Sequence, residues 1–463
     1  MPPDIVLLLC DTARTDAFSP WGGPEPTPTT ERLVREGTAY RRATSAAPWT
    51  LPSVTSILSG LLPSEHGISN DCVEWVDGRP ASPGRSVKSM AGPWLPEELG
   101  RRGYETWAAS CNSWISMWGG FDRGFDRFLD LQDPIRLPRG RFGKLVRRGG
   151  RLAGKVDHGG RRATTEFERR LAAQGSAPLF AFVNLMEVHS PFNPPGSYYP
   201  YPPWRRARTL RQSGASKGDR PFLMYSLGMA DPGPGYAHSM RELYYSCARY
   251  EDALLGSFLE AIEGRGRPTV VVMVSDHGEN LGEDGLFGHN TSLGQTVLHV
   301  PLAVWGSKFQ VEAGWVEEPV SLLGMADWLL RIADSGGDGH LAGGEAVVSE
   351  YESSAKFIPA SVWRRIESEG VEVPPLARQA GLAVRKDRFK YLALENGREA
   401  LYDVEDDPHE ERDLRSQQPD RAAEFASLTE AWMRRRADQP RYAVGEVADE
   451  EMTDHLRELG YIE

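Results

Sequence analysis

Three continuous apolar runs restrict the fold of this 463-residue chain more than any other feature of its sequence. They occupy residues 5–10, 179–185 and 269–274. Short runs of this kind, without alternating polar residues, are typical of strands buried on both faces of a parallel sheet. Asp11 and Asp276 follow the first and the third run. Since α/β folds place their sites at the carboxyl edge of such strands, both carboxylates are candidate functional groups, although Asp11 alone could also be a helix cap.

The pattern changes along the chain and predicts two parts of unequal size. Apolar residues at helical spacing predict helices between the buried strands, at residues 31–37, 95–103 and 240–262. After about residue 310 short strands follow instead, at residues 346–349, 382–385 and 390–393. We therefore expect a main domain of residues 1–310 and a smaller C-terminal subdomain of residues 311–463, with a short antiparallel sheet and terminal helices.

Composition excludes several classes of function. The net charge of −12 argues against a general nucleic-acid binder, and no apolar run is long enough to cross a membrane. The first residues lead directly into a strand without a signal-peptide pattern, so we expect a cytoplasmic protein. The cysteines are scattered without metal-ligand spacing, and we expect buried free thiols at Cys10, Cys72, Cys111 and Cys247.

Residues 47–60 form a proline-bounded turn that carries hydroxyl side chains into a segment with helical spacing. This pattern places Thr50 and Ser53 near the N-terminus of a helix, where backbone N–H groups and the helix dipole favour a bound anion. Helix starts often carry Ser or Thr simply as caps, so a structural role for either residue remains an alternative.

The third buried run leads into residues 275–280, Ser-Asp-His-Gly-Glu-Asn, and then into residues 285–289, Gly-Leu-Phe-Gly-His. A carboxylate and an imidazole side by side, here Asp276 and His277, suit a hard or borderline divalent metal ion. The pattern is a moderate signal alone and a strong one together with Asp11 and Thr50.

These stretches resemble the sulfatase-like family of the alkaline phosphatase superfamily. Residues 50–54, Thr-Leu-Pro-Ser-Val, with Ser-Gly at 59–60, are similar to its nucleophile motif, Cys/Ser-x-Pro-Ser-Arg. Residues 11–16 and 275–289 match its metal-binding segments, and the resemblance extends over nearly the whole chain. It implies an α/β fold with a large mixed, mostly parallel sheet flanked by helices, plus a smaller C-terminal α+β subdomain.

The resemblance also implies a set of site residues and one divalent metal ion, which could be Mn, Mg, Ca or Zn. The expected metal ligands are Asp11, Thr50, Asp276 and His277. His189 and His289 are the expected catalytic or substrate-contacting histidines, with a core histidine as the alternative for His189. Asn112 and Arg14 are further candidate substrate contacts, and Arg14 could equally be a structural partner of Asp16. The family's Gly-Lys-x-His-Leu stretch is missing, and Glu187 stands where relatives have Asp.

The chain departs from the family motif at Thr50 and Val54. Family sulfatases oxidise Cys or Ser to formylglycine, but the β-methyl group of threonine would give a ketone. Threonine in this position resembles superfamily members that act on phosphate esters. We therefore predict a metal-dependent hydrolase of a small anionic phosphoric (di)ester or phosphonate ester with a Thr nucleophile. The alternatives are a sulfuric-ester hydrolase without formylglycine, a phosphoryl-group transferase, and a non-catalytic metal-bearing binding protein.

Overall fold

The structure of the protein is a computed structural model. It describes residues 2–69, 73–76, 79–83, 85–131, 149–150, 154–206, 208–209, 220–335, 340–438 and 444–446.

The largest element is an eight-stranded sheet in the order β13-β2-β12-β9-β1-β8-β6-β7. Its centre is built from the three apolar runs: β1 (Asp4–Cys10) lies parallel to both β8 (Leu179–Leu185) and β9 (Thr269–Val274). The other strands are β2 (Thr38–Thr44), β6 (Glu105–Ser110), β7 (Arg127–Asp130), β12 (Leu302–Ser307) and β13 (Gly314–Ser321). Strand β12 runs antiparallel to both neighbours, so the sheet is mixed and mostly parallel, as predicted.

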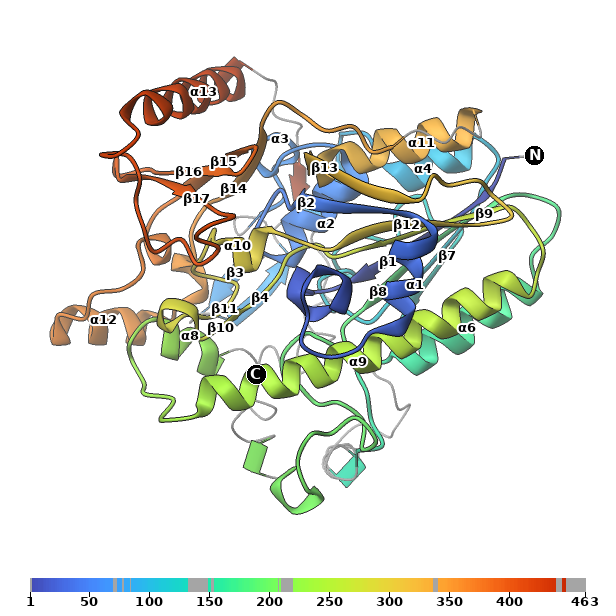
Figure 1. The fold of residues 1–463 in the computed structure, drawn as a ribbon, viewed down its shortest axis with the longest axis horizontal. Coiled ribbons are helices and arrows are strands. Elements are labelled where there is room, and N and C mark those ends of the chain that lie inside the picture. Colours follow the sequence, from blue (N-terminus) through green and yellow to red (C-terminus); the bar gives the residue numbers. More distant parts are fainter. Residues whose placement is uncertain are drawn as a thin grey trace.

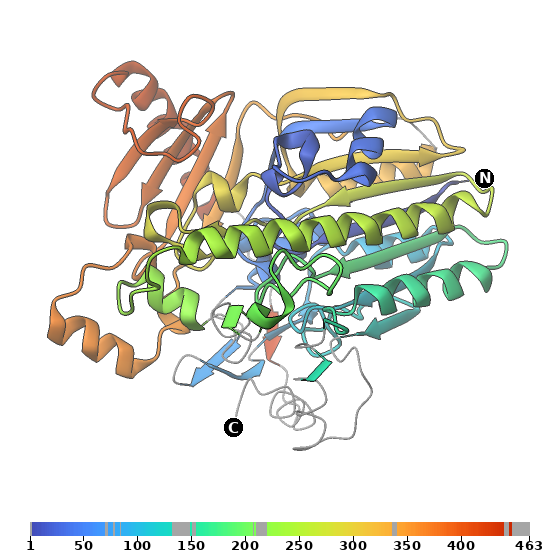
Figure 2. The ribbon, with the colours of Figure 1, turned by 60° about the horizontal axis from the view of Figure 1, so that its bottom comes forward.

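Helices cover both faces of this sheet (Figure 1). Alternate residues of β1 point to opposite faces, so that Leu7 and Leu8 belong to two separate hydrophobic cores. The Leu7 core includes residues of α2 (Thr50–Ser59), α4 (Leu95–Arg101) and α11 (Met325–Ser335). The Leu8 core includes residues of α1 (Pro28–Glu36), α6 (Gly160–Ala172) and α9 (Tyr236–Glu263). Helix α9, green-yellow in Figure 2, extends across most of its face.

A second sheet of four antiparallel strands follows: β14 (Val347–Tyr351), β15 (Gly381–Lys386), β16 (Phe389–Leu394) and β17 (Glu399–Asp403). Helix α13 (Pro419–Asp438) packs on it through Phe425, which stacks with Tyr391. The predicted short antiparallel sheet is thus confirmed, and the end of the chain after residue 446 lies outside the described residues. Because β13 and α11 belong to the main sheet and its core, we propose that the smaller subdomain begins after α11 rather than at residue 311.

The remaining elements are short. The helices are α3 (Pro63–His66), α8 (Arg220–Ser226), α10 (Gln295–Leu298) and α12 (Ala360–Glu369). The strands are β3 (Val73–Val76), β4 (Arg79–Pro83), β5 (Arg85–Met90), β10 (Asn280–Leu281), β11 (Phe287–Gly288) and β18 (Val444–Glu446). Single 3₁₀ turns lie at Thr15–Ala17, Ser19–Trp21, Pro203–Arg205, Glu283–Gly285, Leu322–Gly324, Ala355–Phe357 and Pro375–Ala377.

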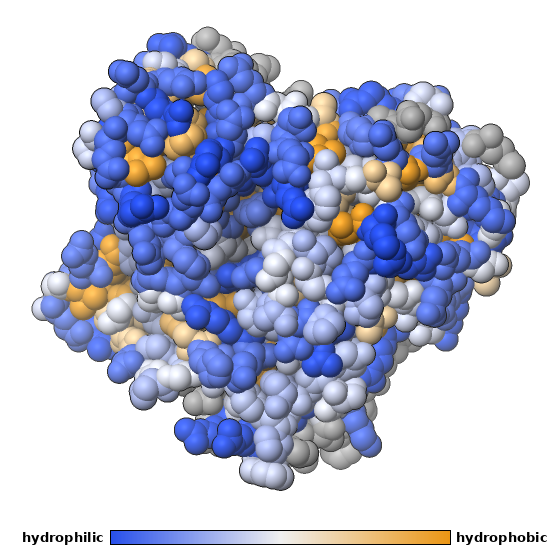
Figure 3. Space-filling model, viewed as in Figure 1, coloured by the Kyte–Doolittle hydropathy of each residue, from blue (hydrophilic) through white to orange (hydrophobic). Residues whose placement is uncertain are grey.

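Apolar side chains gather inside the protein. The face shown in Figure 3 is mostly hydrophilic, with hydrophobic residues in small separate groups. Among the described residues, none of the helices is both long enough and apolar enough to cross a membrane. Cys10, Cys111 and Cys247 are buried free thiols as predicted, and Cys72 lies outside the described residues.

Candidate active site

The carboxyl ends of β1 and β9 bring three predicted metal ligands together. Asp11, Asp276 and His277 each offer a ligand atom, and these atoms lie within 4.8 Å of one another. All three side chains are fully buried. Because β1 and β9 are parallel neighbours, residues that follow them in the sequence meet at one edge of the sheet.

The contacts of Asp276 fit a bound cation. Its Oδ1 accepts hydrogen bonds from the backbone N–H groups of Thr12 (3.1 Å) and His277 (2.9 Å). Its Oδ2 is buried without a hydrogen-bond partner among the described residues, 3.4 Å from His277 Nε2. Burial, and then the neighbouring Asp11 carboxylate, raise the pKa of Asp276 well above its usual range. An unpartnered buried carboxylate oxygen is unfavourable, and a divalent cation at this point would compensate it.

His277 is oriented as a ligand that uses Nε2. Its Nδ1–H donates to the carbonyl oxygen of Gly278 at 2.9 Å, and a carbonyl oxygen can only accept. The lone pair therefore lies on Nε2, which is 3.2 Å from Thr50 Oγ1. Burial lowers the pKa of His277, which favours the neutral, ligating form of the imidazole.

Asp11 is held by amide and hydroxyl donors. Its Oδ2 accepts hydrogen bonds from the side-chain amides of Asn112 (2.6 Å) and Asn184 (3.2 Å), and its Oδ1 accepts one from Thr12 Oγ1 (2.8 Å). Burial opposes ionisation, but electrostatic interaction with the nearby His189 and His277 rings and the hydrogen bonds from Asn112 and Thr12 lower the pKa of Asp11. Asn112, predicted as a substrate contact, is thus an orienting partner of Asp11 in this structure.

Thr50 is the first residue of α2, and its hydroxyl lies 3.2 Å from Nε2 of His277, one of the candidate metal ligands. The N-cap residue is Trp49, which has an extended backbone (φ −152°) and provides no side-chain cap. Ser53, one turn into the helix, donates its hydroxyl to the backbone oxygen of Asp276 at 2.7 Å. This bond fixes α2 to the turn that carries two of the ligands. Neither hydroxyl residue is therefore the cap of this helix.

Two further histidines lie beside the ligands. The His289 ring is 4.4 Å from the His277 ring and 5.8 Å from the His189 ring, measured between centroids. Each is oriented through Nδ1, which donates to Ser190 O in His189 (2.6 Å) and to Glu279 Oε1 in His289 (3.2 Å). These bonds make Nε2 the ring nitrogen that can exchange a proton in both histidines.

Arg14, from the expected set, and Glu187, which stands where relatives have Asp, both have structural contacts. The guanidinium of Arg14 donates to both carboxylate oxygens of Asp16 (2.7 Å each) and to Glu283 (2.8 Å), so we propose the structural role for it rather than a substrate contact. Glu187 accepts the backbone N–H groups of His158 (3.2 Å) and Gly160 (3.0 Å) at the start of α6. It is therefore a helix-terminus partner and does not join the metal ligands.

Sequence reasoning missed three residues that shape the site. Asn184 supports Asp11 from β8, and its signal was a polar residue within an otherwise apolar strand. Thr12 adopts a left-handed backbone conformation (φ 64°) that a β-branched residue rarely takes. Tyr244 of α9 stabilises this turn, since its hydroxyl donates to Thr12 O (3.0 Å) and accepts from Arg14 N (2.8 Å).

Comparison with known proteins agrees with this geometry. Residues 3–335 match the family model described as Sulfatase. The chain belongs to the sulfatase family. It is accordingly a hydrolase that acts on ester bonds. A curated relative called Sulfatase, from Formosa agariphila, is 22% identical over 415 residues, which cover 83% of this chain and 77% of the relative.

Solved structures share the fold of this sulfatase-family protein. The phosphonate monoester hydrolase of Agrobacterium radiobacter has a TM-score of 0.68 at 18% identity. The match covers 94% of this chain and 96% of the hydrolase chain. BT4656, solved with its substrate D-glucosamine-2-N,6-O-disulfate, has a TM-score of 0.67 at 16% identity and covers 95% and 99%. The fold therefore occurs with both phosphorus-ester and sulfate-ester chemistry.

The buried carboxyl group of Glu251 is expected to make the stability of the protein depend on pH. Glu251 of α9 accepts Val188 N–H (3.2 Å) through Oε2, while its Oε1 is buried without a hydrogen-bond partner among the described residues. Burial raises the pKa of Glu251 to about 8. Glu251 therefore binds a proton more tightly in the folded protein than in the unfolded chain. Its favourable contribution to the free energy of unfolding decreases as pH rises towards 8.

We expect Glu251→Gln to stabilise the protein increasingly between about pH 5 and about pH 8, because glutamine stays neutral. The gain approaches about 5 kcal/mol at the upper end, since one pKa unit corresponds to about 1.4 kcal/mol. Urea unfolding of the variant and the wild type at several pH values measures the difference and cancels the other titrating groups. A difference that is independent of pH, or that grows towards low pH, would contradict the assignment.

Proposed function

We propose that this protein hydrolyses a phosphoric diester or a phosphonate ester and that Thr50 is its nucleophile. The observation that carries the proposal is the position of Thr50 Oγ1, buried at the start of α2 and 3.2 Å from His277 Nε2. A divalent cation held by Asp11, Asp276 and His277 would lower the cost of ionising this hydroxyl and withdraw charge from the ester.

The identity of residue 50 favours phosphorus over sulfur. The β-methyl group of Thr50 excludes the aldehyde that formylglycine chemistry needs, and Val54 replaces the arginine of the family motif. The structural similarity to a phosphonate monoester hydrolase supports the same substrate class. The similarity to BT4656, which binds a sulfated sugar, favours one alternative, a sulfuric-ester hydrolase that works without formylglycine.

The residues of the site support a two-step reaction. In the first step Thr50 Oγ1, whose proton has passed to solvent on ionisation, forms a bond to phosphorus as an alkoxide while the bond to the leaving oxygen breaks, and the second step returns it as the alkoxide. The leaving oxygen receives a proton from Nε2 of His189 or His289, whose rings lie 5.8 Å apart beside His277. In the second step water attacks phosphorus, gives a proton to the same imidazole, and displaces Thr50 Oγ1.

An assay of purified protein tests the proposal. Aryl sulfate, phosphate monoester, phosphate diester and phosphonate monoester are offered with Mn²⁺, Mg²⁺, Ca²⁺ and Zn²⁺ in turn. Turnover of a phosphorus ester supports the proposal, and turnover of the aryl sulfate alone overturns it in favour of the sulfuric-ester alternative. Transfer of the phosphoryl group to an added alcohol with little hydrolysis would identify a transferase. Metal binding without turnover of any ester would identify a binding protein.

The two histidines make a prediction about leaving groups. We expect His289→Ala or His189→Ala to lower kcat for an alkyl ester by about 10²-fold, the scale of general acid catalysis. An ester with a nitrophenol leaving group needs little protonation, so its kcat should fall far less. Steady-state kinetics on the two esters provide the test. An equal loss on both esters would show that neither imidazole protonates the leaving oxygen.

A further inference from the structure

The smaller C-terminal subdomain forms hydrogen bonds with the loop that follows His289. Residues 290–295 connect this histidine to α10, and side chains of the smaller subdomain bind them at three points. Tyr351 donates its hydroxyl to Asn290 O at 2.7 Å. Lys390 Nζ donates to Leu293 O, and Glu410 accepts the Gln295 N–H at 2.9 Å. Arg385 adds a contact to the side-chain oxygen of Gln295 at 3.1 Å.

Lys390 and Glu410 form an ion pair at the centre of this contact, with Nζ 2.7 Å from Oε1. Their side chains are only 1% and 12% exposed. Glu410 also has a left-handed backbone conformation (φ 60°), which a residue other than glycine adopts at a cost. Buried ion pairs add little net stability, so such a pair is better explained by the groups it orients.

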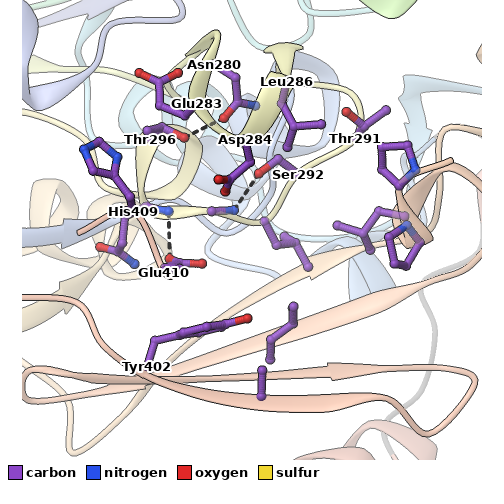
Figure 4. Close-up of a pocket in the computed structure, with 18 of the residues that line it drawn as sticks. Asn280, Glu283, Asp284, Leu286, Thr291, Ser292, Thr296, Tyr402, His409 and Glu410 are labelled. Carbon is purple, nitrogen blue, oxygen red and sulfur yellow. Dashed lines mark hydrogen bonds between the residues drawn. The ribbon is translucent and has the colours of Figure 1, made fainter. Parts of the chain in front are cut away.

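Figure 4 shows the place where these parts meet. A cavity of about 190 Å³ lies between the loop residues and the C-terminal sheet. Thr291, Ser292 and Thr296 line its upper side in this view, Tyr402 lies below, and Glu410 bridges the two parts. Beside the cavity, Leu293 of the loop is buried in the same hydrophobic core as Ala383 and Leu394, so apolar packing accompanies the polar contacts between the loop and the sheet.

Residues on both sides of the loop 290–295 contact the active site. At its start, His289 donates to Glu279 and lies against the His277 ring. In α10, which follows the loop, the backbone oxygens of Val297 and Thr296 accept the N–H groups of Gly278 (2.7 Å) and Glu279 (3.0 Å). The loop therefore connects the Lys390–Glu410 pair to the turn that carries the metal ligands.

We propose that Lys390 and Glu410 are positioning residues that hold His289 where it can protonate the leaving group. The inference rests on the proposed role of His289. It assigns the smaller subdomain a part in the reaction, although neither residue contacts the metal ligands or Thr50.

A double-mutant cycle on the alkyl ester tests the proposal. Lys390→Met with Glu410→Gln removes both charges, so that no unpaired charge remains buried. We expect this double variant to lower kcat on the alkyl ester about tenfold and to change kcat on the nitrophenyl ester by less than about threefold. In a His289→Ala background it should cause no further loss, because the group that it positions is absent.

The matched control is Lys386→Met with Glu424→Gln. It removes an ion pair (2.8 Å) made by Lys386 of the neighbouring strand β15. It changes none of the contacts to residues 290–295 described above. We expect wild-type kinetics from it. An equal loss of kcat with and without His289, or a loss on both esters, would overturn positioning in favour of a general structural role. If His289→Ala itself left kcat unchanged, the proposed role of His289 would fail, and positioning with it. If His289→Ala lowered kcat but Lys390→Met with Glu410→Gln did not, the positioning role would be overturned while the proposed role of His289 would stand.

Discussion

Replacing Thr50 with alanine should reduce turnover of the phosphorus ester on the order of 10³-fold or more, the scale of losing an activated nucleophile. The hydroxyl of Thr50 is the group of α2 that faces the metal ligands, at 3.2 Å from His277 Nε2. The substitution keeps a good helix former at the first position of α2, so the fold should remain intact. Steady-state kinetics of the purified variant on the preferred ester measure the loss.

Two variants serve as controls for this result. Thr50→Ser keeps the hydroxyl and should retain most of the activity, since it removes only the β-methyl group. Ser56 lies later in the same buried helix, where its hydroxyl contacts His66 (3.1 Å) away from the candidate ligands. Ser56→Ala should therefore have little effect on kcat. Full activity of Thr50→Ala would show that another group attacks the ester.

Removing the metal site should have an effect of comparable size. We expect Asp276→Asn to lose bound metal and to lower kcat by roughly 10³-fold, because several kcal/mol of charge stabilisation disappear with the ion. Among the described residues Oδ2 of Asp276 has no hydrogen-bond partner, and it is the atom whose desolvation a bound ion would compensate. Elemental analysis of protein purified without chelator should find one divalent ion in the wild type and none in the variant.

Thermal unfolding provides a readout of the same site that does not depend on activity. Adding the ion at about 100 times its Kd should stabilise the metal-free wild type by about 2.7 kcal/mol and leave Asp276→Asn unchanged. Glu187→Gln is the matched control, since this buried carboxylate binds the start of α6 and not the metal. Equal stabilisation of both variants by the ion would place the metal elsewhere.

The sequence alone predicted the centre of the fold because its signals there are local and strong. Short, mostly apolar runs of this length are typical of fully buried strands, and these became β1, β8 and β9. Parallel strands end at one edge of the sheet, which is why Asp11, Asp276 and His277 met as expected. The match of residues 3–335 to the sulfatase family agrees with the motifs from which this family was predicted.

Other features depend on contacts between distant segments. Strand β13 has an exposed polar character typical of an edge strand, and its pairing with β2 across more than 250 residues has no local signature. The sequence pattern therefore provided no reason to include β13 in the main domain. The ion pair of Arg14 with Glu283 (2.8 Å) joins residues that are 269 positions apart in the sequence. The Lys390 contact to the His289 loop likewise joins two parts of the chain that sequence spacing cannot relate.

A covalent adduct on Thr50 is the most direct test of the central claim. The enzyme is mixed with its phosphorus ester, quenched in acid within milliseconds, and analysed by mass spectrometry of the intact chain and of its peptides. If Thr50 is the nucleophile, a phosphoryl or phosphonyl group will be found on the peptide that contains Thr50 and will be absent from Thr50→Ala. A mass increase on another residue, or none during confirmed turnover, would contradict Thr50 as the nucleophile.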